Sequence, residues 1–332
     1  MLNRRTLIAA TALAGAMALA PLAQAQDKMR IALVPKALGI GFFEAAERGA
    51  RQAAEELGDV EIIYTGPTDT TAEGQIETVN ALIAQQVDAI AISANDPDAL
   101  VPALKRAMER GIAVVSWDSG VAPEGRMAHL NPSSNQLIGE MNVKLAADAM
   151  PEGKTQAAIL SASPTHTNQN TWIAEMEKVV GNYPNVEIVT TVYGDDLSDK
   201  SYRETQGLLQ NYPDLGVIIA PTSVGIVAAA QAVSDAGKIG EVFVTGLGLP
   251  SEMAGHVKSG ATKSFAIWNP IDLGYAATML AHELAKDPAA ADDGKVSLGK
   301  IGERELDANK DTAMAEPFIY DASNIDDFKD IF

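Results

Sequence analysis

The chain has 332 residues, which is more than one hydrophobic core usually holds, so we expect two domains. Its formal net charge of -19 argues against nucleic acid or an anionic membrane as a partner. The absence of cysteine excludes a thiol nucleophile, a cysteine-ligated zinc site and disulfide bonds.

Residues 1–25 have the pattern of a signal peptide. An arginine pair precedes an apolar run over residues 7–20, which is shorter than the ~20 residues that a membrane-spanning helix needs. The small-x-small order of a cleavage site follows in Ala23-Gln24-Ala25. An uncleaved anchor and a twin-arginine signal are the alternatives. We expect a mature chain that is free in the periplasm.

Short apolar runs alternate with longer amphipathic runs through the first half of the mature chain, which is typical of a parallel α/β sheet. The first strand, residues 29–34, leads through a glycine turn into a helix that begins at Phe42. The same pattern predicts further strands at 60–64, 89–93 and 112–116, and helices at 72–84 and 98–110.

A second series of strands and helices follows and has a similar length. It predicts strands at 157–161, 186–192, 216–220, 241–245 and 263–267, and helices at 133–149, from about 170, and at 200–210, 225–236 and 271–285. We therefore expect an α/β fold with two doubly wound parallel-sheet lobes. Hinge crossings are predicted near residues 131–132 and 268–270. The expected N-terminal lobe is 26–130 plus 270–300, and the C-terminal lobe is 131–269 plus 301–332.

The common signatures of an enzyme are absent. Gly39 and Gly41 follow the first strand, but Glu44 occupies the position of the third glycine of a dinucleotide fingerprint. The sequence has no Walker A motif and no G-x-S-x-G elbow, and its four histidines lack metal-ligand spacing. We interpret His166 as a polar loop residue, and residues 195–199 as a capped helix start. The sequence thus predicts no catalytic residues, no cofactor and no metal.

The predicted strand ends do carry a chemistry that suits a small polyhydroxy ligand. Three aromatic side chains offer flat apolar faces for the C–H face of a sugar ring, and polar groups nearby hydrogen-bond hydroxyls. Because parallel strands end at one edge of a sheet, these side chains are expected to converge. The candidate ligand-binding residues are Lys36, Phe42, Phe43, Asp118, Asn168, Gln169, Pro221, Thr222, Ser223 and Trp268, with Ser93 and Gly248 as weaker candidates. Core packing and helix capping are the alternative roles for each residue taken singly.

The chain resembles the type I periplasmic sugar-binding proteins of ABC importers, and most closely their rhamnose-binding and autoinducer-2-binding branch. The resemblance covers essentially the whole mature chain. It is carried by the segments at residues 34–43, 93–99, 116–120, 167–170, 193–202, 219–222 and 268–275. It implies two α/β lobes that close on a ligand. It also implies delivery to a membrane permease that works with a cytoplasmic ATPase.

The ligand implied by the resemblance depends on two positions. In autoinducer-2 receptors of this branch, the contacts correspond here to Lys36, Asp118, the pair Asn168-Gln169, Pro221 and Ser223. Asn168 replaces a carboxylate and Ser223 replaces an alanine. Since the loop at 167–170 and the segment at 193–202 look more like the rhamnose-binding group, we favour a 6-deoxyhexose as the ligand. We expect the protein to be a monomer. The rivals are an autoinducer-2 receptor, a secreted sugar-modifying enzyme and a transcription regulator with the same pair of lobes.

Overall fold

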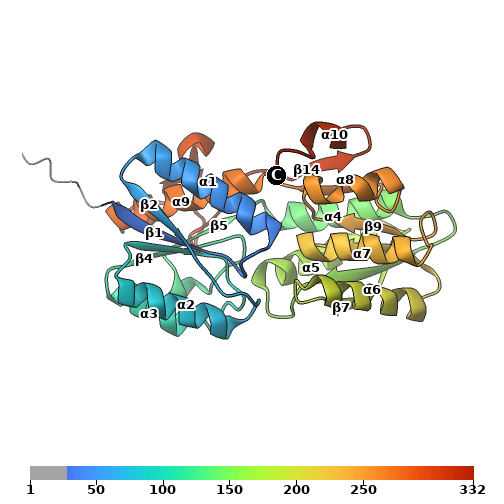
Figure 1. The fold of residues 1–332 in the computed structure, drawn as a ribbon, viewed down its shortest axis with the longest axis horizontal. Coiled ribbons are helices and arrows are strands. Elements are labelled where there is room, and N and C mark those ends of the chain that lie inside the picture. Colours follow the sequence, from blue (N-terminus) through green and yellow to red (C-terminus); the bar gives the residue numbers. More distant parts are fainter. Residues whose placement is uncertain (1–27) are drawn as a thin grey trace, which may run out of the picture.

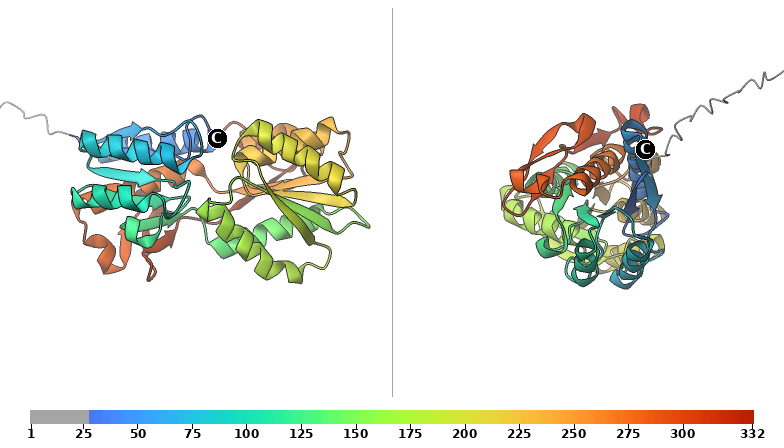
Figure 2. Two further views of the ribbon diagram at one scale, coloured as in Figure 1. Left: turned by 90° about the horizontal axis from the view of Figure 1, so that it is seen from below. Right: turned by 90° about the vertical axis from the view of Figure 1, so that its left-hand side faces the viewer.

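The computed structural model describes residues 28–332, which form two lobes side by side along the long axis of the molecule (Figure 1). The expected signal peptide lies outside the described residues. Each lobe has a central sheet with helices on both of its faces, as the view from below in Figure 2 shows. The predicted α/β fold with two doubly wound parallel-sheet lobes is confirmed. Within residues 28–332, no helix combines the length and the apolar character needed to cross a membrane.

The N-terminal lobe has six parallel strands in the order β13-β5-β4-β3-β1-β2. Helices α1 and α9 pack together against one face of this sheet, and α2 and α3 pack together on the other side. The bounds are β1 (Met29–Val34), α1 (Gly41–Leu57), β2 (Val60–Tyr64), α2 (Ala72–Gln85), β3 (Ala89–Ile92), α3 (Val101–Glu109), β4 (Ala113–Trp117), β5 (Ala128–Asn131), α9 (Pro270–Lys286) and β13 (Asp311–Ala313).

The hydrophobic sequence of β1 explains its central place. Side chains alternate between the two faces of a strand, and Ile31 and Leu33 belong to one core cluster, while Ala32 and Val34 belong to the other. All four are fully buried. A strand covered by helices on both faces must be apolar at every position, which is why β1 reads as a continuous apolar run.

The C-terminal lobe repeats this plan with parallel strands in the order β7-β6-β8-β9. A bridge from Leu247 to Ala266 adds β10, and β14 pairs antiparallel with β10. The bounds are α4 (Asn135–Ala149), β6 (Gln156–Ser161), α5 (Thr167–Val179), β7 (Glu187–Tyr193), α6 (Ser198–Asn211), β8 (Leu215–Ala220), α7 (Ser223–Asp235), β9 (Phe243–Gly246), α8 (Pro250–Ser259), β10 (Ser264–Ile267), β14 (Phe318–Asp321) and α10 (Ile325–Phe328).

Three segments of the described chain pass between the lobes. They link β5 to α4, β10 to α9, and β13 to β14. The first two lie at the predicted crossings, and the third was not expected. The assignment of residues 301–332 to the C-terminal lobe is wrong for residues 301–313. There β13 joins the N-terminal sheet beside β5, and the small hairpin of β11 (Lys295–Ser297) and β12 (Glu303–Glu305) precedes it and contacts α9.

Several predicted boundaries differ from the structure. Helix α5 begins at Thr167 rather than near residue 170, so that Asn168 and Gln169 lie in its first turn. Helix α3 begins at Val101 rather than residue 98, because the Asp96 carboxylate accepts backbone N–H groups and forms a turn before the helix. Strand β5 and helix α8 were not predicted, although Pro250 at the start of α8 is a typical first helical residue.

Helices α1 and α9 approach so closely that only glycine fits between them. A Cβ atom on Gly49 would lie 1.7 Å from the Ile271 carbonyl oxygen, and one on Gly274 would lie 1.9 Å from the Ala46 carbonyl oxygen. This backbone contact fixes the N-terminal end of α1 against the N-terminal end of α9. Phe42 lies in the first turn of α1 and Trp268 lies just before α9, and the two rings meet in the cleft described next.

Candidate ligand-binding site

A narrow pocket lies between the lobes at the carboxyl ends of the strands, with a cavity volume of about 40 Å³. The structure places all ten predicted site residues on its wall. Five further residues line it that the sequence reasoning missed. The lining residues are Lys36, Ile40, Phe42, Phe43, Asp118, Asn168, Gln169, Trp172, Asp196, Pro221, Thr222, Ser223, Leu247, Ile267 and Trp268. The weaker candidate Ser93 lies behind Asp118, and Gly248 is not in the lining.

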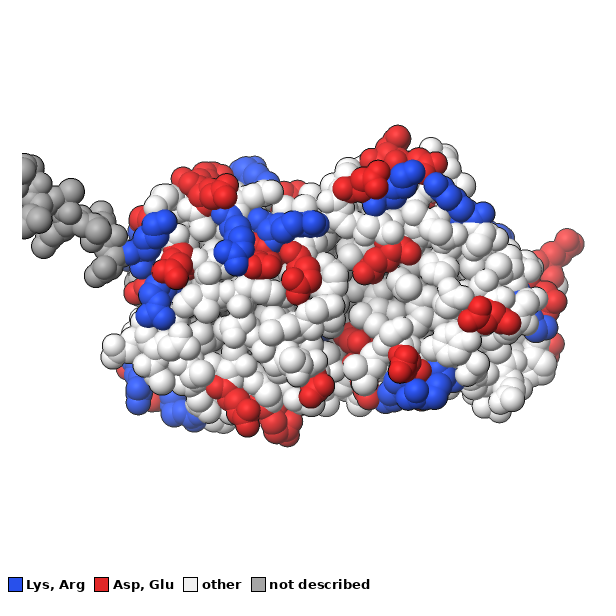
Figure 3. Space-filling model, viewed as in Figure 1, with Lys and Arg blue, Asp and Glu red and all other residues white. Residues whose placement is uncertain are grey.

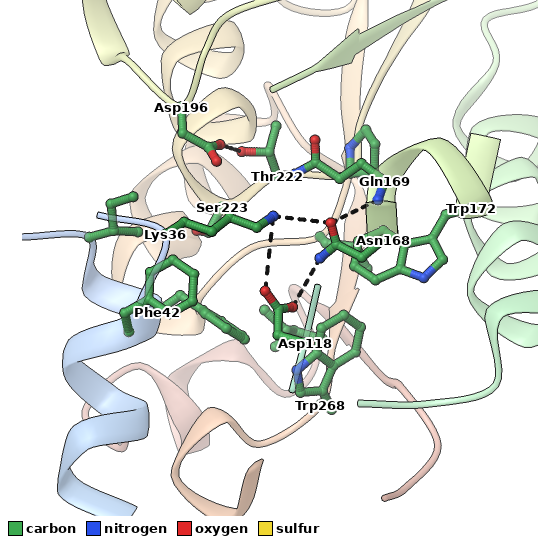
Figure 4. A pocket seen from close by; sticks show the side chains of 15 residues that line it. Lys36, Phe42, Asp118, Asn168, Gln169, Trp172, Asp196, Thr222, Ser223 and Trp268 are labelled. Carbon is green, nitrogen blue, oxygen red and sulfur yellow. Dashed lines mark hydrogen bonds and ion pairs between the residues drawn. The ribbon is translucent and has the colours of Figure 1, made fainter. Parts of the chain in front are cut away.

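A hydrogen-bonded set of polar side chains links the two lobes inside the pocket (Figure 4). The Lys36 ammonium of the N-terminal lobe donates to Asn168 Oδ1 of the C-terminal lobe at 3.0 Å. The Asn168 amide in turn donates to Asp118 Oδ1 at 3.0 Å, and the Lys36 Nζ to Asp118 Oδ2 distance is 4.0 Å. Ser93 donates to Asp118 Oδ2 at 2.8 Å. The two hydrogen bonds of Asn168 cross the cleft and form only when the lobes are together, whereas Lys36, Ser93 and Asp118 all belong to the N-terminal lobe.

Asp196 supplies a second carboxylate that the sequence reasoning did not place in the site. It accepts a hydrogen bond from the Thr222 hydroxyl. Its Oδ2 lies 3.8 Å from Nδ1 of His166, which is itself 3.4 Å from Lys36 Nζ. The expected capped helix start is wrong, because Leu197 is the N-cap of α6 and makes no side-chain cap bond. His166 lies in the loop before α5, as predicted, and is fully buried behind Lys36.

Burial dominates the protonation chemistry of this set. Burial raises the pKa of Asp118, although the Lys36 charge and the hydrogen bonds from Ser93 and Asn168 act to lower it. It also raises the pKa of Asp196, against the charge of Lys36 and the hydrogen bond from Thr222. Burial and the Lys36 charge lower the pKa of His166, which is therefore neutral near pH 7. Hydroxyl donors from a ligand would stabilise the ionised form of either carboxylate.

Aromatic side chains form the apolar part of the wall. The Phe42 ring meets Phe43 and Trp268 edge to face, with centroid distances of 5.3 and 6.2 Å. Trp172 meets Trp268 at 5.7 Å. The indole N–H of Trp268 has no hydrogen-bond partner within the described residues. A flat apolar surface facing a polar set is the arrangement that a sugar ring needs, with C–H groups on one side and hydroxyls on the other.

Contacts outside the pocket also hold the lobes together. Threonine hydroxyls donate across the cleft to backbone oxygens, from Thr70 to Asp195 at 2.8 Å, from Thr165 to Asn95 at 2.9 Å and from Thr167 to Gly120 at 2.8 Å. The lobes meet along a seam in Figure 3. Acidic and basic side chains are scattered over the whole visible face of the molecule, without a continuous basic patch. The structure is thus a closed form of a two-lobed protein.

Asp118 and Asp196 are both carboxylates in the pocket lining. Among residues 28–332 there is no cluster of three or more histidine, aspartate or glutamate side chains arranged to hold a metal ion.

The sequence matches a family model described as a periplasmic binding protein domain over residues 31–289. It is 30% identical over 257 residues to the D-ribose/D-allose-binding protein of Pseudomonas aeruginosa, with 73% of this chain and 79% of that relative covered. These matches extend over both lobes.

Solved structures give the same result. The solute binding protein of an ABC transporter from Clostridium phytofermentas, solved with bound L-rhamnose, is 34% identical, with a TM-score of 0.86 and coverage of 92% of this chain and 99% of that chain. LsrB from Clostridium saccharobutylicum in complex with AI-2 has a TM-score of 0.84 at 23% identity, covers 90% of this chain and 99% of that chain, and so shares the fold. The resemblance drawn from the sequence is confirmed, and the chain belongs to the periplasmic binding protein family.

Proposed function

We propose that this protein is the sugar-binding component of an ABC importer and that it captures a monosaccharide in the pocket between its lobes. The observation that carries the proposal is the cross-lobe set of Lys36, Asp118 and Asn168 facing an aromatic wall. Both lobes contribute to one small pocket, so a ligand bound there stabilises the closed form. In this role the protein is a carrier and not an enzyme.

The ligand that we favour is a 6-deoxyhexose, with L-rhamnose as the first candidate. The sugar hydroxyls would pair with Lys36, Asp118, Asn168 and Gln169, and the methyl group would need an apolar surface such as that of Phe42. The likeness to a solute binding protein solved with L-rhamnose supports this choice. The alternative within the family is autoinducer-2, against which Asn168 and Ser223 argue as departures from the residues that the resemblance implies.

The remaining parts of the proposal follow from transport. Residues 1–25 would direct export to the periplasm and then be removed. The mature protein would act as a monomer, and the closed, liganded form would dock on a permease in the inner membrane. A two-lobed protein offers the permease a different surface when it is open, so the carrier signals that it is loaded by closing.

Isothermal titration of residues 26–332 with L-rhamnose, ribose and autoinducer-2, in separate runs, tests the ligand. We expect L-rhamnose to bind with a dissociation constant on the order of micromolar or below, because its hydroxyls would be paired with polar groups of the pocket. Heat with autoinducer-2 and none with L-rhamnose would contradict the deoxyhexose. Silence with these three and with a wider panel of monosaccharides would contradict sugar capture itself.

A further inference from the structure

Asp196 has surroundings that differ from those of the other polar residues in the pocket. Its Oδ1 accepts the Thr222 hydroxyl, whereas no side chain of the described residues donates a hydrogen bond to its Oδ2. Nδ1 of the neutral His166 ring lies 3.8 Å from Oδ2, which is too far for a hydrogen bond. Asp196 also lines the outer depression that adjoins the pocket. One carboxylate oxygen is therefore held in place, and the other lacks a partner.

The two carboxylates of the pocket are presented from opposite lobes. Asp118 follows β4 of the N-terminal lobe, and Asp196 follows β7 of the C-terminal lobe. In Figure 4 they lie on opposite sides of the Lys36 ammonium, and the Lys36 charge acts on both. A ligand between them meets an anionic acceptor on each side.

The backbone at both carboxylates is in a conformation that side chains rarely adopt. The φ angle is 58° at Asp118 and 51° at Asp196, with 55° at the neighbouring Asp195. Left-handed backbone is unfavourable at a residue with a side chain, although aspartate and asparagine tolerate it best. Strain of this kind persists where the surrounding structure needs a side chain in one position, and it is common at ligand sites.

We propose that Asp196 is a specificity-determining residue that accepts a hydrogen bond from a ring hydroxyl of the sugar through its free Oδ2. The inference rests on the proposed function and extends it. The ligand must then present one hydroxyl to Asp118 and a different hydroxyl to Asp196. Sugars that lack the second hydroxyl, or carry it on the other face of the ring, leave a buried carboxylate without a donor and bind more weakly.

The test combines a substitution with a series of sugars. Asp196→Asn keeps the shape of the side chain but removes its charge, and asparagine also tolerates the positive φ angle. Asp199→Asn is the matched control, because Asp199 lies in the first turn of α6 and is exposed. Both variants and the wild type are titrated calorimetrically with L-rhamnose and with its 2-deoxy, 3-deoxy and 4-deoxy derivatives.

We expect Asp196→Asn to weaken L-rhamnose binding by roughly 10- to 100-fold, the usual effect of losing a charge-assisted hydrogen bond, and Asp199→Asn to leave it within about 2-fold. One deoxy derivative should bind the wild type more weakly than L-rhamnose does, by a similar factor. Its affinity should fall little further in Asp196→Asn, because the missing hydroxyl and the missing carboxylate are the two halves of one interaction. Equal affinities of wild type and Asp196→Asn for L-rhamnose would overturn the role of Asp196 alone. If the wild type binds another monosaccharide instead, its deoxy series serves in the same way. A wild type that binds no monosaccharide overturns the proposed function and this inference together.

Discussion

Replacing Lys36 with methionine is expected to raise the dissociation constant for the captured sugar by at least about 100-fold. The substitution keeps most of the side-chain volume but removes the only cation that residues 28–332 contribute to the pocket lining. Each hydrogen bond to a charged group is worth about 1.5–3 kcal/mol. The variant loses two of them, one from Lys36 to the sugar and one from Lys36 to Asn168 of the other lobe. Calorimetric titration of the wild type and the variant with the same sugar measures the loss.

Lys144→Met is the control for removing a lysine charge. Lys144 lies on α4 with an exposed side chain and pairs with Asp148 of the same helix, at 2.6 Å. We expect its affinity for the sugar to stay within about 2-fold of the wild type, since exposed pairs contribute little. A thermal unfolding curve shows whether Lys36→Met is folded. A folded Lys36→Met protein that binds the sugar within 10-fold of the wild type would show that Lys36 is not a ligand contact.

Replacing Trp268 with alanine is expected to abolish detectable sugar binding and to lower the thermal midpoint. Trp268 is 3% exposed and packs edge to face against Phe42 and Trp172, so its removal takes away the wall on which the sugar ring would lie. Deleting a buried tryptophan costs about 3–5 kcal/mol of stability. Trp268→Phe retains an aromatic face and should retain most of the stability and part of the affinity.

Intrinsic fluorescence gives this prediction a direct measurement. The chain has three tryptophans, of which Trp172 and Trp268 line the pocket and Trp117 packs on Phe43, 5.7 Å between ring centroids. Adding the sugar should change the emission of the wild type and should leave that of Trp268→Ala almost unchanged. Undiminished calorimetric affinity of a folded Trp268→Ala protein would mean that the sugar does not lie on this wall.

Much of the fold could be predicted from the sequence because its strands are buried on both faces. A continuous apolar run such as β1, followed by a glycine turn and an amphipathic helix, identifies a βα unit without any knowledge of the tertiary structure. Pairing between distant segments cannot be read in this way. The strand β13 has three residues, and its parallel pairing with β5, together with the contact of the β11–β12 hairpin with α9, assigns residues 301–313 to the N-terminal lobe. The third crossing was missed for the same reason.

The site could be predicted as far as its residues lie directly after strands. Lys36, Asp118, Pro221 and Trp268 follow β1, β4, β8 and β10, and parallel strands bring such positions to one edge. Asp196 also follows a strand, β7, but its acidic neighbours favoured a helix cap, and nothing in the local pattern shows that its side chain is buried against Thr222. Trp172 lies one turn into α5, where the apolar pattern of the helix predicts core packing rather than pocket lining.

The central claim is that a monosaccharide is captured between the two lobes, and a crystal structure of residues 26–332 with L-rhamnose tests it most directly. We expect one sugar in the pocket, with its hydroxyls within hydrogen-bond distance of Lys36 and Asp118 and its C–H face on Trp268. The lobes should be closed through the contact between Lys36 and Asn168, at about the 3.0 Å found here. A sugar bound outside the cleft, or a cleft that stays open around it, would contradict the account.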